Sequence, residues 1–289
     1  MPHHHISFSR FIATCAAIFM LAGCATTPVP DAPSGPAPDD RLNATLWMQQ
    51  AVEYKAATET VYALASKRLD EALADRSWTA APAEQGAGYE NLPPAIILDA
   101  DETVIDNSPF QAMMVTTGAG FSEDTWNDWA RDEKAMAVPG ALQFTQEAAA
   151  KGVTVFYVTN RSEVVDGATT RNLAALGFPM KAGEDTVLTK TDTSKKGVRR
   201  AMVTANYRVL LLIGDNFGDF VDDYKGTPTE RQQVYDANAE RWGREWLVLP
   251  NPSYGSWESS AFGDDYSLSP EEQRQMKLDQ LKAWRPKGE

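Results

Sequence analysis

Residues 95–107 read AIILDADETVIDN, and this stretch decides the fold. Its branched apolar residues follow Pro93-Pro94 and form a run too short for a helix, which predicts a buried strand. The strand ends at two aspartates, Asp99 and Asp101, separated by one residue. In an open α/β sheet, ligands bind in the crevice beyond the carboxyl ends of the strands. Two carboxylates there would repel each other and lose hydration, so we expect a positive charge, most simply a divalent cation, to compensate them.

Further apolar runs of the same kind follow, and helical patterns separate them. We predict strands at residues 153–158, 186–189, 208–213 and 246–249, and helices at 42–75, 139–152, 163–176, 195–205, 228–242 and 270–284. Strands that alternate with helices favour a mainly parallel sheet with right-handed crossovers. We therefore expect an α/β protein with a Rossmann-like sheet flanked by helices, and helical additions at both ends of the chain.

One segment breaks the alternation. Residues 106–138 contain a Gly-Ala-Gly sequence, then Phe121, Trp126 and Trp129 with acidic residues between them, and do not resemble the single helix of a plain βαβ unit. We predict that this segment is an insertion that folds over the strand end as a small helical cap.

The N-terminus has the pattern of an export signal. Arg10 precedes an apolar run at residues 11–21, which is too short to span a membrane, and the run leads into Leu-Ala-Gly-Cys24. These four residues resemble a bacterial lipobox, which implies a signal peptide over residues 1–23 and a lipid anchor on Cys24. Ala25 then favours the outer membrane of the cell envelope. We expect residues 24–41, rich in Pro and Ala, to be a flexible tether to a single catalytic domain at 42–289.

Removal of the signal peptide would leave the chain without histidine and without a free cysteine. All 3 histidines and Cys15 lie inside it, and Cys24 would be acylated. The remaining chain would therefore contain no Ser-His-Asp or Cys-His nucleophile, no histidine-ligated zinc and no disulfide. A metal would have to be held by oxygen ligands, which favours magnesium.

The charge of the chain limits its partners. A formal net charge of −13 argues against a nucleic-acid polymer, because such binding neutralises phosphates with Lys and Arg. A small phosphorylated molecule remains a possible ligand if a metal and a few fixed cations reverse the sign locally.

Polar side chains follow several predicted strands and would converge on one edge of a parallel sheet. They are Asp99 and Asp101, Thr159, Asp215, and Lys195 or Lys196 at the start of a helix. Together they suit phosphoryl transfer: Asp99 would attack phosphorus, and Asp101 would protonate the leaving oxygen and later deprotonate water. Asp99, Asp215 and the backbone carbonyl of Asp101 would hold Mg²⁺.

The remaining groups would bind the phosphate. The Thr159 side chain and the backbone N–H of Asn160 could hold phosphate oxygens, and the lysine would stabilise both nucleophile and phosphate.

These motifs resemble those of a known superfamily. The DADETV sequence at residues 99–104, Thr159, the lysine and GDNFGD at 214–219 are similar to the four motifs of the haloacid dehalogenase (HAD) superfamily. The sequences ILDADETVIDNS at 97–108, VPGA at 138–141, VTNR at 158–161 and GDNFGDF at 214–220 resemble the class C nonspecific acid phosphatases, the bacterial lipoprotein e type 5'-nucleotidases.

The resemblance implies a role for each position. Asp99 corresponds to the nucleophile, Asp101 to the acid/base, Asp215 to the third metal ligand and Asp219 to a support of the metal waters or the lysine. A Ser-x-Lys-x-x-Arg pattern at residues 194–199 selects Lys196, with Lys195 as the alternative. The implied protein is a magnesium-dependent acid phosphatase that forms an aspartyl-phosphate on Asp99.

Aromatic residues bear on the substrate. The family holds a base or ring between side chains of the cap and of a late loop, and Trp126, Trp129 and Tyr254 occupy the matching regions. Stacking tolerates many bases, which suits nucleoside 5'-monophosphates; alternatively, both tryptophans only pack the cap. Two other functions stay open: a catalytically inactive, ligand-binding surface lipoprotein, and a phosphotransferase or sugar phosphatase.

Overall fold

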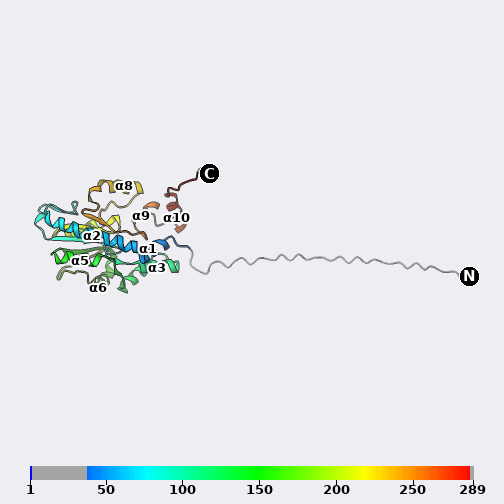
Figure 1. Cartoon of the computed structure of the whole chain (residues 1–289), viewed down its shortest axis with the longest axis horizontal. Helices are drawn as coiled ribbons and strands as arrows, with labels where there is room; N and C mark the ends of the chain where they lie inside the picture. The colour runs from blue at the N-terminus through cyan, green and yellow to red at the C-terminus, as the bar shows by residue number, and fades with distance from the viewer. Residues whose placement is uncertain (2–37, 287–289) are drawn as a thin grey trace. The chain divides into compact units, whose positions relative to one another are not determined.

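The computed structural model describes residue 1 and residues 38–286 (Figure 1). The predicted signal peptide, Cys24 and most of the tether lie outside the described residues. Within the described part of the chain, no helix has the length and apolar character needed to cross a membrane.

A parallel sheet forms the centre of the molecule. Its five strands lie in the order β5-β4-β1-β6-β7, with bounds β1 Pro94–Leu98, β4 Thr154–Ser162, β5 Val187–Lys190, β6 Arg208–Gly214 and β7 Trp246–Val248. Every neighbouring pair is parallel. This sheet confirms the predicted α/β class. Because the chain moves from β1 to β4 on one side and returns to β6 on the other, the end of β1 lies at the point where the strand order reverses, where such sheets bind ligands.

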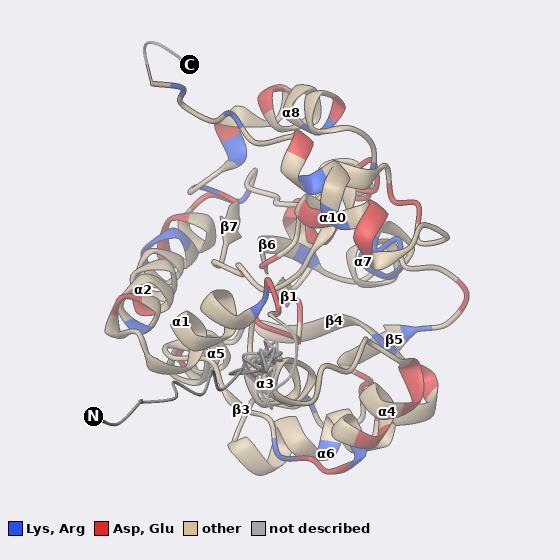
Figure 2. Cartoon of the chain, turned by 90° about the vertical axis from the view of Figure 1, so that its right-hand side faces the viewer, with Lys and Arg blue, Asp and Glu red and all other residues tan. Residues whose placement is uncertain are grey.

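Helices cover both faces of the sheet, because the side chains of β1 are apolar on both faces. Ile96 and Leu98 pack with residues of α2 (Val52–Ala74) and α5 (Ala141–Ala150), whereas Ala95 and Ile97 belong to a cluster that includes Val203 of α7 (Gly197–Thr204). Figure 2 shows α2 and α5 on one side of β1 and β6, and α7 on the other. Successive strand residues point to opposite faces, so a strand covered on both sides is apolar throughout.

The predicted cap segment lies between β1 and α5. It holds α3 (Ser108–Thr117) and α4 (Glu123–Arg131) between two short antiparallel strands, β2 (Ile105–Asp106) and β3 (Met136–Ala137). Helix α4 packs against α6 (Asp166–Leu176) and the 3-10 turn Glu163–Val165 that follows β4. The cap therefore follows β1 in the chain and packs against the segment that follows β4.

The N-terminal helix is not continuous, contrary to the prediction of one helix over 42–75. It consists of α1 (Leu42–Gln50) and α2, separated at Ala51, whose ψ of 126° is extended. Neither glycine nor proline marks this position. The break instead follows the packing, because α1 contacts α3 while α2 contacts α5.

Other boundaries differ by a few residues. Strand β4 continues past Thr159; α5 begins after Gly140, which has a φ of +88°, rather than at Pro139; and α7 begins after Lys196 rather than at Lys195. Near the C-terminus, α8 (Pro228–Ala237) ends before the predicted residue 242 and is followed by a 3-10 turn. A short α9 (Ser256–Ser259) was not predicted, and α10 (Pro270–Asp279) ends before the predicted end at Trp284. Residues 280–286 are exposed, so no tertiary contact extends that last helix.

Candidate active site

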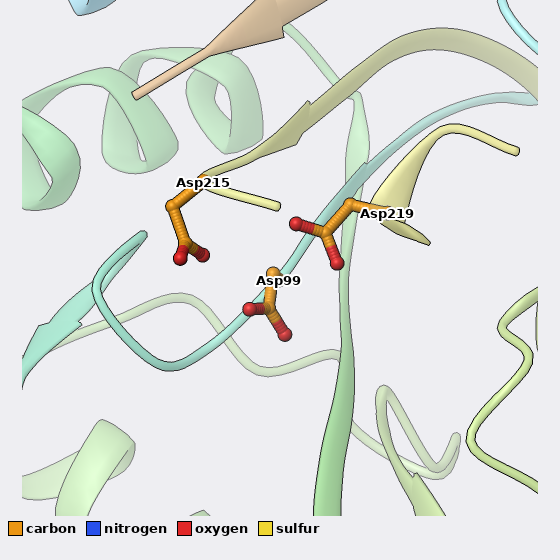
Figure 3. Close-up of side chains that lie close together, drawn as sticks. All are labelled: Asp99, Asp215 and Asp219. Carbon is orange, nitrogen blue, oxygen red and sulfur yellow. The ribbon is translucent and has the colours of Figure 1, made fainter. Parts of the chain in front are cut away.

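Three carboxylates meet at the carboxyl ends of β1 and β6. Asp99 directly follows β1, and its N–H donates to the carbonyl of Ile213 in β6 (2.9 Å). Asp215 directly follows β6, and Asp219 lies in the next 3-10 turn, Phe217–Asp219. One carboxylate oxygen from each of the three lies within 4.8 Å of the others, and Figure 3 shows the three side chains close together.

Burial disfavours negative charge in this cluster. Loss of hydration, with the nearby charges of Asp219 and Glu102, raises the pKa of Asp215 to about 8. Burial also raises the pKa of Asp99 well above its ordinary value, although Lys196 opposes this effect. Without a cation besides Lys196, burial therefore favours protonation of these carboxylates.

Lys196 is the one of the two candidate lysines that reaches the cluster. Its Nζ contacts Asp99 Oδ1 and lies 2.7 Å from Asp219 Oδ1, and the residue is 4% exposed. Lys195 is exposed. Burial by itself would lower the pKa of Lys196, but Asp219 and Asp99 outweigh that effect and raise it. Asp219 and Asp99 together therefore favour the charged form of the lysine.

Asp215 is oriented by two further residues. Thr103 Oγ1 donates to Asp215 Oδ1 (3.1 Å), and Asn251 Nδ2 donates to Asp215 Oδ2 (2.8 Å). Bonds of this kind commonly orient carboxylates that bind metals. The all-oxygen donor set and its excess of negative charge fit a hard divalent cation such as magnesium.

Asp101 faces a different set of partners. Its Oδ1 accepts from Arg161 Nε and Asn107 Nδ2, both at 2.9 Å, and its Oδ2 accepts from Thr159 Oγ1 at 3.2 Å. The side chain of Asp101 is thus separate from the three-carboxylate cluster, although the two aspartates are only two residues apart.

Thr159 and Asn160 are held by an arginine from α7. Arg199 donates to the carbonyl of Thr159 and, at 2.7 Å, to Asn160 Oδ1. The Asn160 side chain is therefore occupied, and the predicted contribution of this residue to phosphate binding would come from its backbone N–H.

Tyr254 contacts an acid that sequence reasoning did not select. Glu102 is fully buried, with a φ of +54°; its Oε1 accepts from the N–H of Asn107 (2.9 Å), and its Oε2 accepts from the Tyr254 hydroxyl. Burial, with the charge of Asp101, raises the pKa of Glu102 to about 8. Tyr254 thus links the late loop to the segment that follows β1.

The two cap tryptophans are half-buried in α4. Trp129 Nε1 donates to Asn107 Oδ1 (2.8 Å). The Trp126 ring lies edge-to-face with Phe110 (5.0 Å between centroids), and the Arg161 guanidinium lies 5.3 Å from its centre. Both residues therefore make internal contacts beside Asp101.

Sequence reasoning missed six residues of this region. They are Glu102, Thr103, Asn107, Arg161, Arg199 and Asn251. All except Asn251 fall inside the motifs at 97–108, 158–161 and 194–199, but local spacing does not show which side chains meet across the sheet.

Solved structures of similar fold support the assignment of a family. The class C acid phosphatase from Bacillus anthracis is 34% identical, with a TM-score of 0.76 over 85% of this chain and 98% of that one. A structure of the same enzyme with tungstate bound matches at 33% identity, a TM-score of 0.75 and the same coverage.

Two plant proteins share part of the sequence. Acid phosphatase 1 of Solanum lycopersicum is 30% identical over 43% of this chain and 51% of its own length, and a stem 31 kDa glycoprotein of Glycine max is 24% identical over 45% and 53%. The chain thus spans about half the length of these relatives. The profile of the HAD superfamily, subfamily IIIB (acid phosphatase), matches residues 37–257, and the chain therefore belongs to that family.

Proposed function

We propose that this chain is a magnesium-dependent acid phosphatase that hydrolyses phosphomonoesters, with nucleoside 5'-monophosphates as its substrates. The observation that carries the proposal is the meeting of Asp99 and Lys196 with two further carboxylates, Asp215 and Asp219, at the ends of β1 and β6. Family membership supports the same reaction class.

The reaction would proceed in two displacements. In the first, an Asp99 oxygen attacks phosphorus, the bond from phosphorus to the leaving oxygen breaks, and protonated Asp101 gives its proton to that oxygen. In the second, water attacks the aspartyl-phosphate, Asp101 takes a proton from that water, and the bond from phosphorus to Asp99 breaks. Phosphate leaves, and Asp101 is again protonated.

The chain's own groups would stabilise the transferring phosphoryl group. Lys196, the Thr159 hydroxyl and the Asn160 N–H would hold its oxygens. A magnesium ion held by Asp99, Asp215 and the carbonyl of Asp101 would supply the positive charge that offsets the phosphate. The Bacillus anthracis relative with tungstate bound supports an oxyanion site of this kind.

The proposed nucleotide substrate and the proposed membrane anchor rest on separate features. The aromatic side chains of Trp126, Trp129 and Tyr254 near Asp101 and Glu102 support recognition of a nucleobase, because every base can stack on an aromatic face. The Leu-Ala-Gly-Cys24 sequence supports attachment to a membrane through a lipid on Cys24, and Ala25 after it favours the outer membrane.

The activity test uses the purified chain with p-nitrophenyl phosphate and with nucleoside 5'-monophosphates, each with Mg²⁺ and with a chelator. We expect Asp99→Asn to lower kcat by about 10³-fold or more, because the amide is a poor nucleophile. The control is Asp223→Asn, which changes an exposed carboxylate and should retain wild-type kcat.

Four outcomes would contradict the proposal or part of it. Activity that survives the chelator would exclude the metal, and wild-type kcat in Asp99→Asn would exclude the nucleophile. A wild-type protein that is inactive with Mg²⁺ present would favour the ligand-binding alternative. An excess of released p-nitrophenol over free phosphate when an alcohol is added would indicate phosphotransfer.

A further inference from the structure

The two oxygens of Asp101 have different surroundings. Oδ1 accepts two N–H bonds, from Arg161 Nε and Asn107 Nδ2, both at 2.9 Å. Oδ2 accepts only the hydroxyl of Thr159, at 3.2 Å, among the described residues. Because two donors already occupy Oδ1, a proton on this carboxyl group resides on Oδ2. The network thus selects the oxygen that can act as an acid.

The selection depends on the orientation of the Asn107 amide. Its oxygen accepts from Arg161 Nη2 (2.9 Å) and from Trp129 Nε1 (2.8 Å), which leaves its NH₂ group directed at Asp101. Asn107 is fully buried and Arg161 is 1% exposed, so water cannot readily replace these donors. An amide turned the other way would place its oxygen against a carboxylate oxygen.

The cap therefore contacts the proton-transfer group through one intermediate residue. Trp129 belongs to α4 of the cap, whereas Arg161 belongs to β4 of the sheet, and both bond to the same oxygen of Asn107. We propose that Trp129 is a positioning residue whose indole N–H orients Asn107, and so determines which oxygen of Asp101 protonates the leaving group. This inference rests on the proposed phosphatase function.

The step concerned is the first displacement. The proton on Asp101 Oδ2 passes to the leaving oxygen as the bond from phosphorus to that oxygen breaks, and that oxygen keeps the bonding electron pair. Asp101 is left as a carboxylate beside the Arg161 guanidinium, which stabilises it. A leaving group that is stable as an anion needs this proton little, and a basic one needs it greatly.

The test compares two substrates that differ in leaving group but share an aromatic ring, p-nitrophenyl phosphate and phenyl phosphate. The variant is Trp129→Phe, which keeps a ring and removes the N–H. We measure kcat/KM, because it includes no step after the leaving group departs. We expect a loss of about tenfold for phenyl phosphate and of less than about threefold for p-nitrophenyl phosphate, as imperfect general-acid catalysis predicts.

One control separates positioning from packing. Trp78→Phe removes a buried N–H bond to the carbonyl of Leu210 (2.8 Å) elsewhere in the core, and should lower Tm without changing that ratio.

The outcomes distinguish this inference from the proposed function. An equal loss for both substrates in Trp129→Phe, or no loss, would overturn the positioning role while leaving an active wild type. An inactive wild type would overturn the phosphatase function itself. If Trp129→Phe does not fold, Trp129→Met supplies the second variant: its flexible apolar side chain also lacks the N–H, and it should show the same selective loss.

Discussion

Gly214, the last residue of β6, leaves room for the carboxylate of Asp219. A Cβ at this position would lie 2.2 Å from Asp219 Oδ2, far inside van der Waals contact. Asp219 cannot easily move, because it accepts from the N–H of Asn216 (2.8 Å) and pairs with Lys196 (2.7 Å). Asp219 therefore occupies space that is open only because residue 214 is a glycine.

We expect Gly214→Ala to displace Asp219 and with it Lys196. The extra methyl group should lower the free energy of unfolding by about 1–3 kcal/mol and lower kcat/KM by about tenfold or more. Urea denaturation and the p-nitrophenyl phosphate assay measure the two effects. Gly86→Ala is the matched control, since a Cβ there meets nothing within 4 Å. Wild-type kcat/KM in Gly214→Ala would show that catalysis does not depend on the position of Asp219 beside Lys196.

At the scale of elements, α2 supports the segment that follows β1. The Tyr62 hydroxyl on this helix donates to the carbonyl of Thr103 (2.6 Å), and Thr103 Oγ1 in turn donates to Asp215 (3.1 Å). Tyr62 is 2% exposed, so the bond is buried. A helix that precedes the sheet in the chain thus helps to orient a predicted metal ligand.

Removal of this hydroxyl should destabilise the protein. We expect Tyr62→Phe to lower the free energy of unfolding by about 1–3 kcal/mol, because the carbonyl of Thr103 loses a buried donor. Tyr54→Phe on the same helix is the control: its buried hydroxyl has no hydrogen-bond partner among the described residues, and its loss should change stability by less than about 0.5 kcal/mol. Urea denaturation compares the two variants. Equal changes in the free energy of unfolding would show that the bond from Tyr62 to the carbonyl of Thr103 does not stabilise the protein.

At the scale of the whole molecule, stability is linked to the protonation of the site. The pKa of Asp215 is raised from 3.8 to about 8 by burial, with Asp219 and Glu102 adding to the effect. Between these two values the folded protein retains a proton that the unfolded chain has lost. The free energy of unfolding of the metal-free protein should therefore fall as the pH rises through this window.

A bound metal should oppose this decrease in the free energy of unfolding. We expect Mg²⁺ to raise Tm more at about pH 8 than at about pH 5, because at the lower pH the ion must displace protons from its ligands. Thermal unfolding with and without Mg²⁺ at each pH measures the difference. Asp215→Asn should show a much smaller rise at both. A Tm increase that does not depend on pH would place the ion away from these carboxylates.

The amino-acid sequence by itself determined the sheet and the identity of its polar strand ends. Alternating apolar strands and helices allow few connections other than parallel crossovers, and parallel strands bring their carboxyl ends to one edge. Asp99 and Asp215 were therefore predictable as neighbours, and Lys196 was selected by a resemblance in local sequence. These inferences depend only on patterns of residues close together in the chain.

Only the tertiary structure decided how the remaining side chains pair. The separation of α1 from α2 at Ala51, the positive φ of buried Glu102 and the bond from Trp129 to Asn107 have no local signature. The sequence favoured Trp129 as a stacking surface, yet its N–H is directed at an amide beside Asp101. The physical reason is that hydrogen bonds and packing between distant segments depend on the three-dimensional placement of whole elements, which periodicity and spacing do not encode.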